Sequence, residues 1–507
     1  MSSNSKIEHR LLKTTAVSFL STALSIIIQL ISVPICLRYW GKTTYGTWLA
    51  LSAAYTILRT VDGGFTSFVG NKLNMLYHQD QQEMCKVLAS AVWGVILLGS
   101  LQIVIVLALY FSNSMSLIMG SAVSGISTSQ TIFGLMVMSL TWILTGSYIG
   151  VLHRFLIPNG MLYQLLWWVM LLQVSQSLSI MLAAYFQFSV FHAALFFAFA
   201  QAAVYISSAF YIKLRLPQFY PWLSGAKLKI GLREIVNSFP MTVNGAIQQA
   251  GNSGVVVLVS AVLGAAVIPI YSTMRTLSNL WTTVTNIVTA PLLPDIVRFH
   301  ATREPRKFIM VHKTHVLLMS VIINLSIMLA YPLIDAVYLY WTRGKLPIDH
   351  RLICLLLASV SVFALNSLFN TFLTGLNNGR YLVIMGLLRG FFVLVAGYLL
   401  LPIFGLSGIG MAILLAEILL MAANTYIFIR GELKLIGAER ESLFAWYDIL
   451  CFASVLVFLL LNVCFVHLSM IYYLISLALL FIGMIYAWIN LEIEIKSRIL
   501  RMLRLAH

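Results

Sequence analysis

Long apolar runs recur from one end of the chain to the other, and this feature constrains the fold more than any other. An α-helix needs roughly 20 apolar residues to cross a hydrocarbon layer of about 30 Å, and the runs are of that length. They do not alternate with a period of two residues, which argues against a membrane β-barrel. Only 9% of the residues are charged, whereas soluble globular proteins have about 25%. The sequence therefore predicts an all-α, polytopic membrane protein.

The apolar runs predict about fourteen membrane spans. Six of them form an N-terminal lobe (1–212), which is followed by a cytoplasmic linker loop (213–234) and a second six-helix lobe (235–430). Residues 431–507 hold two further spans and a basic cytoplasmic tail. The predicted spans cover approximately residues 14–37, 45–70, 87–110, 131–151, 161–184, 190–212, 235–262, 268–296, 312–334, 351–376, 381–402, 406–429, 447–467 and 470–490.

The basic residues predict the orientation of the chain in the membrane. Of the 32 Lys and Arg residues, 24 lie in segments on the same side as the two termini. Because cytoplasmic loops carry an excess of Lys and Arg, both termini are expected in the cytoplasm. The net charge of +16 is then mostly a topology signal and does not favour nucleic-acid binding. The tail from Lys496 to Arg504 predicts a short basic helix lying on anionic lipid.

No cofactor or metal site is expected. The five cysteines are scattered without metal-binding or redox spacing. No phosphate-binding loop of the Walker type occurs, so direct use of ATP is not expected.

Polar side chains occur inside predicted spans, where lipid should exclude them. Span one carries a polar stripe that includes Gln29. Span seven carries Asn244, Gln248 and Asn252 on one helix face. Close helix packing could explain Ser and Thr, but stacked amides need water or partners, because an unpaired buried amide is costly. Both spans are therefore predicted to face an aqueous cavity.

Charged residues inside the spans are the sharper signal, since an ionisable residue in a membrane is a functional hypothesis by default. Arg59 and Asp62 share a face of span two and could neutralise each other. Arg389 and Glu417 lie at similar depth on adjacent spans and could form a structural pair. Arg275 in span eight has no acidic residue near it in its span. It is the strongest candidate for an anion ligand, because Arg binds phosphate through a bidentate fork.

In two segments an apolar helix is followed by a Gly, a Tyr and a second helix. The first segment contains Gly41, Tyr45-Gly46 and Asp62-Gly63, and the second contains Gly264, Tyr271, Arg275, Pro291 and Pro294. With these residues, the two segments resemble bacterial polysaccharide exporters, the Wzx-type O-antigen flippases of the multidrug/oligosaccharidyl-lipid/polysaccharide (MOP) exporter superfamily.

The resemblance implies a MATE-like fold of two helical lobes around a central cavity in the bacterial inner membrane. It implies that an undecaprenyl-diphosphate-linked oligosaccharide moves from the cytoplasmic to the periplasmic leaflet by alternating access, coupled to H⁺ or Na⁺. It also implies association with polysaccharide polymerase machinery. The expected ligands of the diphosphate or acidic sugars are Arg59, Arg275 and Arg389, those of the sugar hydroxyls are Gln29, Asn244, Gln248 and Asn252, and the candidates for ion coupling are Asp62 and Glu417.

Two other functions stay open. A MATE-type small-molecule antiporter that exports cationic drugs should have an acidic cavity, whereas arginines outnumber acids deep in these spans. A membrane polysaccharide polymerase or ligase would be an enzyme with an acceptor site on a sizeable periplasmic loop. The longest such loop, near 111–130, has no charged residue, His or Cys. The sequence therefore favours a transporter without enzymatic activity.

Overall fold

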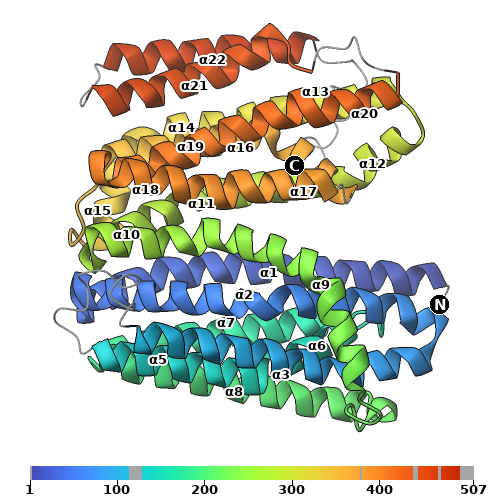
Figure 1. Ribbon diagram of the computed structural model, residues 1–507. Coiled ribbons are helices and arrows are strands. Elements are labelled where there is room, and N and C mark those ends of the chain that lie inside the picture. The colour runs from blue at the N-terminus through green and yellow to red at the C-terminus, as the bar shows by residue number, and fades with distance from the viewer. Residues whose placement is uncertain (1–2, 113–127, 377–378, 438–442, 466–469, 491–507) are drawn as a thin grey trace. The chain divides into compact units, whose positions relative to one another are not determined.

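The computed structural model describes residues 3–112, 128–376, 379–437, 443–465 and 470–490 (Figure 1). Nearly all of these residues are helical, and no strand occurs among them. Every predicted span coincides with a helix, which confirms the all-α class. The predicted basic helix of the tail, from Lys496 to Arg504, lies outside the described residues.

Within the described part of the chain, 12 helices are long and apolar enough to cross a membrane. Two predicted spans are not among them: α2 (Gly41–Gln79) and α11 (Ile268–Thr289). These two helices carry Arg59, Asp62 and Arg275. A helix of such polarity is tolerated in a membrane only where protein or water, rather than lipid, surrounds its polar groups.

The chain divides into two compact units, which we describe separately. Unit 1 comprises residues 1–269 and 341–346. Its central helix is α2, which contacts helices from both earlier and later parts of this unit. The helices packed with α2 are α1 (Ser3–Tyr39), α3 (Gln81–Phe111), α5 (Thr128–Thr141), α6 (Tyr148–Phe155), α8 (Val190–Arg215), α9 (Leu228–Gln249) and α10 (Val255–Leu263), and α7 (Leu162–Tyr185) packs on α1 and α8.

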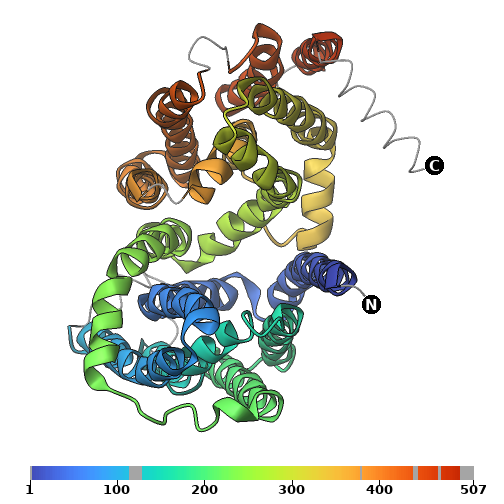
Figure 2. The same ribbon diagram turned by 90° about the vertical axis from the view of Figure 1, so that its right-hand side faces the viewer.

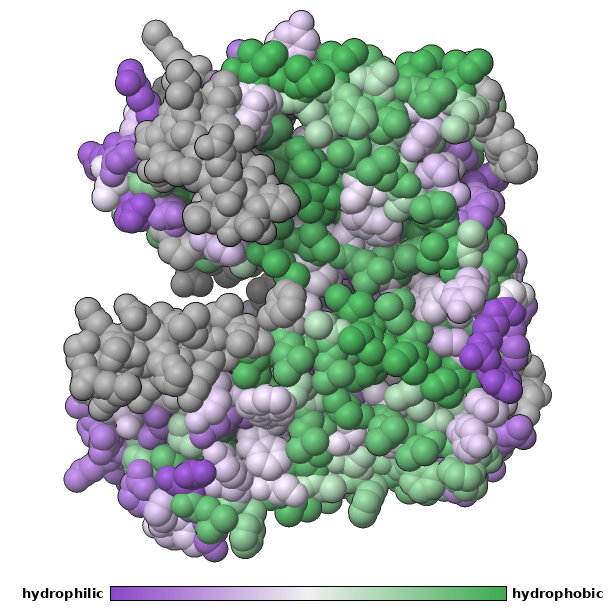
Figure 3. All heavy atoms as spheres, turned by 180° about the vertical axis from the view of Figure 1, so that it is seen from behind, coloured by the Kyte–Doolittle hydropathy of each residue, from purple (hydrophilic) through white to green (hydrophobic). Residues whose placement is uncertain are grey.

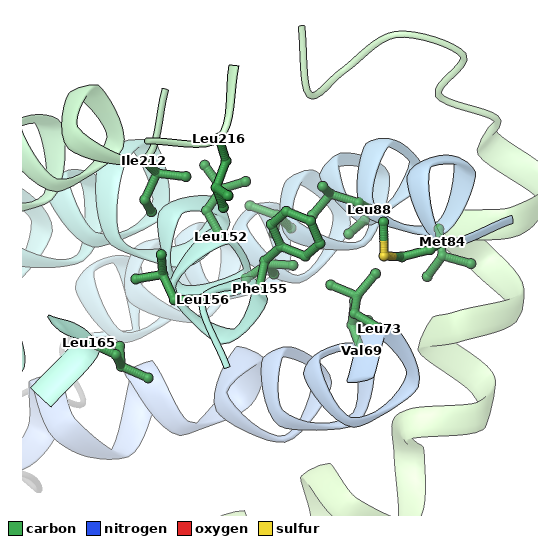
Figure 4. Packing of buried hydrophobic residues seen from close by; sticks show 14 of the residues in the cluster. Val69, Leu73, Met84, Leu88, Leu152, Phe155, Leu156, Leu165, Ile212 and Leu216 are labelled. Atoms are coloured by element: carbon green, nitrogen blue, oxygen red, sulfur yellow. The ribbon is translucent and has the colours of Figure 1, made fainter. Parts of the chain in front are cut away.

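A cluster of fully buried apolar side chains fixes α2 against its neighbours (Figure 4). Leu73 of α2 packs in this cluster with Met84 of α3, Phe155 of α6 and Ile212 of α8. In lipid, such packing stabilises helix association through close contact rather than through removal of apolar surface from water. The cluster thereby holds the charged turn of α2 at a defined place in the unit.

Unit 2 comprises residues 270–340 and 347–507. Its central helix is α16 (His350–Gly375), which is buried along nearly its whole length. Many helices of both units are seen end-on in Figure 2. Besides α11, the other helices of unit 2 are α12 (Leu293–Ala301), α13 (Pro305–Met319), α14 (Leu325–Ala330), α15 (Ile334–Thr342), α17 (Gly379–Gly386), α18 (Val393–Phe404), α19 (Leu406–Ala423), α20 (Arg430–Leu435), α21 (Trp446–Cys464) and α22 (Met470–Asn490).

The helices after the predicted linker (213–234) pack in unit 1, since α9 and α10 contact α2. Grouping by packing therefore differs from the lobes at 1–212 and 235–430, which stay a prediction. On the face shown in Figure 3, apolar side chains cover the middle of the helices in each unit, and hydrophilic ones gather toward the helix ends. This is the distribution expected of helices that span a bilayer.

Five π-helical segments interrupt the described helices. Such segments make up well under 1% of residues in soluble proteins and often mark functional sites. Four of them, η2, η7, η9 and η10, carry polar side chains that bind residues of other helices. The segments are η2 (Trp142–Ser147), η4 (Ala250–Gly254), η7 (Ser320–Asn324), η9 (Leu387–Phe392) and η10 (Asn424–Ile429).

Adjacent glycines in α2 provide a matched test of its packing on α9. A Cβ atom on Gly64 would overlap the backbone of Thr242, whereas one on Gly63 would meet nothing within 4 Å. We expect Gly64→Ala to destabilise the protein by about 1–3 kcal/mol, because α9 must move away. Gly63→Ala should leave stability unchanged or raise it, since Ala favours the helix. Thermal unfolding of the purified variants checks this, and equal melting temperatures for both would contradict it.

Candidate functional site

Asp62 of α2 is fully buried in unit 1 and is bound by two side chains of η2. The indole N–H of Trp142 donates to both carboxylate oxygens, at 3.0 Å to Oδ1 and 2.9 Å to Oδ2. The hydroxyl of Ser147 also donates to Oδ2. Residues five apart diverge by about 140° around a regular α-helix, but the i→i+5 pairing of a π-helix brings them to one side. The π-helical segment therefore lets both donors reach one carboxylate.

Arg59 lies one turn before Asp62 on α2 but does not form an ion pair with it. Its guanidinium carbon lies 4.4 Å from the centre of the Trp142 ring, and the guanidinium also interacts with the hydroxyl of Tyr55. Among the described residues, no carboxylate lies within ion-pair distance of Arg59. Arg59 and Asp62 therefore do not neutralise each other as a direct ion pair.

Amide and aromatic side chains extend this cluster within unit 1. The Tyr55 hydroxyl donates to Oε1 of Gln201 at 2.7 Å, and Nε2 of Gln176 donates to the same oxygen at 3.1 Å. The ring of Tyr205 packs edge-on against Trp142 at 5.7 Å. None of these residues was predicted from the sequence to belong to the site. The position of Trp142 could have indicated them. Tryptophans usually lie at the membrane interface, whereas Trp142 lies in the middle of a predicted span.

Arg389 and Glu417 of unit 2 form an ion pair, with 2.9 Å between Nη2 and Oε2. Their side chains are 23% and 14% exposed, so the pair is largely shielded. Arg389 belongs to η9 and also lies over the ring of Phe363 at 5.1 Å. Arg389 and Glu417 thus form the structural pair that was one of the predicted alternatives, and the charge of Arg389 is compensated within unit 2.

A buried network of amides lies in the same unit. Nδ2 of Asn424, in η10, donates to Oδ1 of Asn366 at 3.0 Å and to Oδ1 of Asn370 at 2.7 Å. The hydroxyl of Tyr381, from α17, donates to Oδ1 of Asn370 at 2.7 Å. Each of these amides has a hydrogen-bond partner in the protein, but Nδ2 of Asn370 and Oδ1 of Asn424 are buried without one. The network joins α16, α17 and η10.

Arg275 lies on α11 and is half-buried. Within the described part of the chain it forms no ion pair with a carboxylate. Of the three arginines predicted from the sequence, Arg59 and Arg275 therefore form no ion pair with a described carboxylate, whereas Arg389 does. Each of the two lies on a helix that is too polar to qualify as an ordinary membrane span.

The predicted amide ligands fall into two groups. Gln29 of α1 and Asn252 of η4 have exposed side chains. The side chains of Asn244 and Gln248, on α9, lie outside what the structure describes. Among the described residues, no group of three or more His, Cys, Asp or Glu side chains could hold a metal ion.

Comparison with known proteins identifies the fold. No family model matches the chain, and no curated protein matches it. Solved structures do. An inward-facing multidrug resistance MATE family transporter of the MOP superfamily is 14% identical, with 82% of this chain and 96% of that chain covered and a TM-score of 0.60. The lipid II flippase MurJ, in an inward closed conformation, is 12% identical, with 93% and 98% covered and a TM-score of 0.59. A point mutant of the Vibrio cholerae MATE transporter VcmN is 15% identical, with 86% and 100% covered and a TM-score of 0.54.

Proposed function

We propose that this protein is a flippase. Its fold is similar to that of MATE transporters and of a lipid II flippase. Its substrate would be an oligosaccharide linked to undecaprenyl diphosphate, such as an O-antigen repeat unit. The substrate would move from the cytoplasmic to the periplasmic leaflet of a bacterial inner membrane by alternating access, with both termini of the protein in the cytoplasm. The observation that carries this proposal is the pair of arginines, Arg59 and Arg275, that have no carboxylate partner among the described residues.

The chemistry of the substrate explains why unpaired arginines are useful. A sugar diphosphate cannot cross hydrocarbon unaided, because removing its charges from water is very costly. A planar guanidinium can bind a phosphate through two parallel hydrogen bonds and keeps its charge when desolvated. Arg59, in unit 1, and Arg275, in unit 2, are two such groups. The polyprenyl tail needs no polar ligand, since lipid solvates it.

Ion coupling is assigned to Asp62 or Glu417 as part of the proposal. Each carboxylate is bound in the present state, Asp62 by Trp142 and Ser147 and Glu417 by Arg389. Uptake of H⁺ or Na⁺ by either group would weaken those bonds. Because the partners lie on other helices or in π-helical segments, the change would be transmitted to the packing of the unit.

Export of small cations is the second candidate function. The MATE transporters among the solved structures of the same fold support it. A cationic drug needs a carboxylate that it can contact directly, whereas Asp62 is fully buried and Glu417 is already paired with an arginine. The arrangement of charges therefore favours an anionic head group over a cationic substrate.

Transport by purified protein in liposomes tests the proposal. The substrate is a fluorescent oligosaccharide on polyprenyl diphosphate, and its exposure on the outer leaflet is measured with a membrane-impermeant quencher. We expect translocation by the wild-type protein and none by the Arg59→Ala/Arg275→Ala variant. Efflux of a cationic dye without lipid translocation would instead support the second candidate. Joining or hydrolysis of the sugars would indicate an enzyme and contradict both transport functions.

A further inference from the structure

We infer that Trp142 is a positioning residue that keeps the guanidinium of Arg59 apart from Asp62 and available to an anion. The inference rests on the proposed function and deepens it, because it explains how one binding arginine stays unpaired. It starts from a conflict on α2. Arg59 and Asp62 are three residues apart on one helix, a spacing at which opposite charges normally pair.

The indole of Trp142 contacts both charges in different ways. Its N–H edge donates to the two carboxylate oxygens of Asp62, and its face carries the guanidinium of Arg59 at 4.4 Å. An aromatic ring attracts a cation at its face and presents positive charge at its edge. One side chain therefore satisfies both groups without letting them meet.

The exposure of the two charged groups differs. Asp62 is 0% exposed and Trp142 is 7% exposed, so the carboxylate is sealed inside unit 1. Arg59 is only partly buried. A guanidinium that lies on a ring face does not use its N–H donors in that contact. Most of the N–H groups of Arg59 therefore remain free for hydrogen bonds to phosphate oxygens.

Contacts with Asp62, Arg59 and Tyr205 fix the orientation of the Trp142 ring. Ser147, at the opposite end of η2, donates to the same carboxylate as the indole. Tyr205 packs edge-on against the ring. Trp142 cannot turn without losing its hydrogen bonds to Asp62. The π-helical segment η2 supports this arrangement, because it brings Trp142 and Ser147 to the same carboxylate. Removing the ring would leave Arg59 free to fold back onto Asp62 and form the ion pair that the tryptophan prevents.

Binding of a lipid diphosphate tests the inference directly. The full-length protein is placed in nanodiscs of phosphatidylethanolamine and phosphatidylglycerol, and its affinities for a polyprenyl diphosphate and for the uncharged polyprenol are measured. We expect Trp142→Ala to weaken diphosphate binding by about tenfold or more. The matched control is Trp167→Ala, which removes an exposed tryptophan of α7 and should bind as the wild-type protein does.

Rescue separates positioning from a merely structural role. In Trp142→Ala/Asp62→Asn the carboxylate that would capture Arg59 is gone, so diphosphate binding should return toward the wild-type level. Trp142→Phe keeps a ring for Arg59 but removes the donor to Asp62, and it should bind several-fold more weakly than the wild-type protein. If Trp142→Ala is not monodisperse, the affinity of Trp142→Phe tests whether Trp142 positions Arg59.

The outcomes distinguish the inference from the proposed function. Wild-type affinity in Trp142→Ala or Trp142→Phe, or a double variant as weak as Trp142→Ala, would show that Trp142 does not position Arg59. If the wild-type protein binds the diphosphate no better than the polyprenol, or if Arg59→Ala binds it equally well, the proposed function itself is wrong.

Discussion

Arg275→Ala is expected to abolish surface polysaccharide in cells that depend on this protein, while the protein accumulates in the membrane at its normal level. Arg275 forms no ion pair with a described carboxylate, so its removal strands no acidic partner. What is lost is the bond to the substrate. Hydrogen bonds to charged groups contribute about 1.5–3 kcal/mol each, and a bidentate contact contains two. A decrease in transport of at least about tenfold follows.

The matched control for this prediction lies in the same unit. Arg298 of α12 is 62% exposed and pairs with Asp295 at 2.9 Å, so Arg298→Ala should leave surface polysaccharide unchanged. Arg275→Lys keeps the charge but loses the planar fork, and partial activity is expected. The measurements are the amount of surface polysaccharide and the amount of protein in the membrane fraction. Normal polysaccharide in Arg275→Ala would remove this arginine from the proposed site.

Glu417→Ala should destabilise the protein far more than an ordinary surface substitution. It leaves the largely shielded guanidinium of Arg389 without its ion-pair partner. Breaking a buried pair from one side costs about 3–5 kcal/mol, because an uncompensated charge remains. Replacing both members, as in Arg389→Leu/Glu417→Leu, removes both charges and should restore much of the lost stability.

Thermal unfolding of the purified variants checks this ordering. The control is Glu304→Ala, which breaks the solvent-exposed pair of Glu304 with Lys307 and should change the melting temperature little. A double variant as unstable as Glu417→Ala would contradict the account. Translocation by a stable double variant then tests coupling: if Glu417 carries the ion, the folded double variant should move lipid without dependence on the gradient.

Part of the candidate site could be predicted from the sequence, and the reason is the cost of charge in lipid. Arg59, Arg275 and Arg389 stood out because few ionisable residues occur inside membrane spans. Their partners could not be predicted in the same way. The spacing of Arg59 and Asp62 predicts a shared helix face, but it does not say which neighbouring helix reaches that face first.

The pattern of residues along the chain was sufficient to predict a bundle of membrane-spanning helices and to locate nearly every helix. A bilayer demands long apolar runs with internally satisfied backbones, and such runs are visible without knowledge of their neighbours. Which of the charged side chains form direct ion pairs follows instead from how the helices pack against one another. Trp142, 80 residues after Asp62, takes that carboxylate, while Glu417 pairs with Arg389. The partner of a charged side chain depends on which helices pack together and on π-helical turns such as η2. Neither can be predicted from the local pattern of residues.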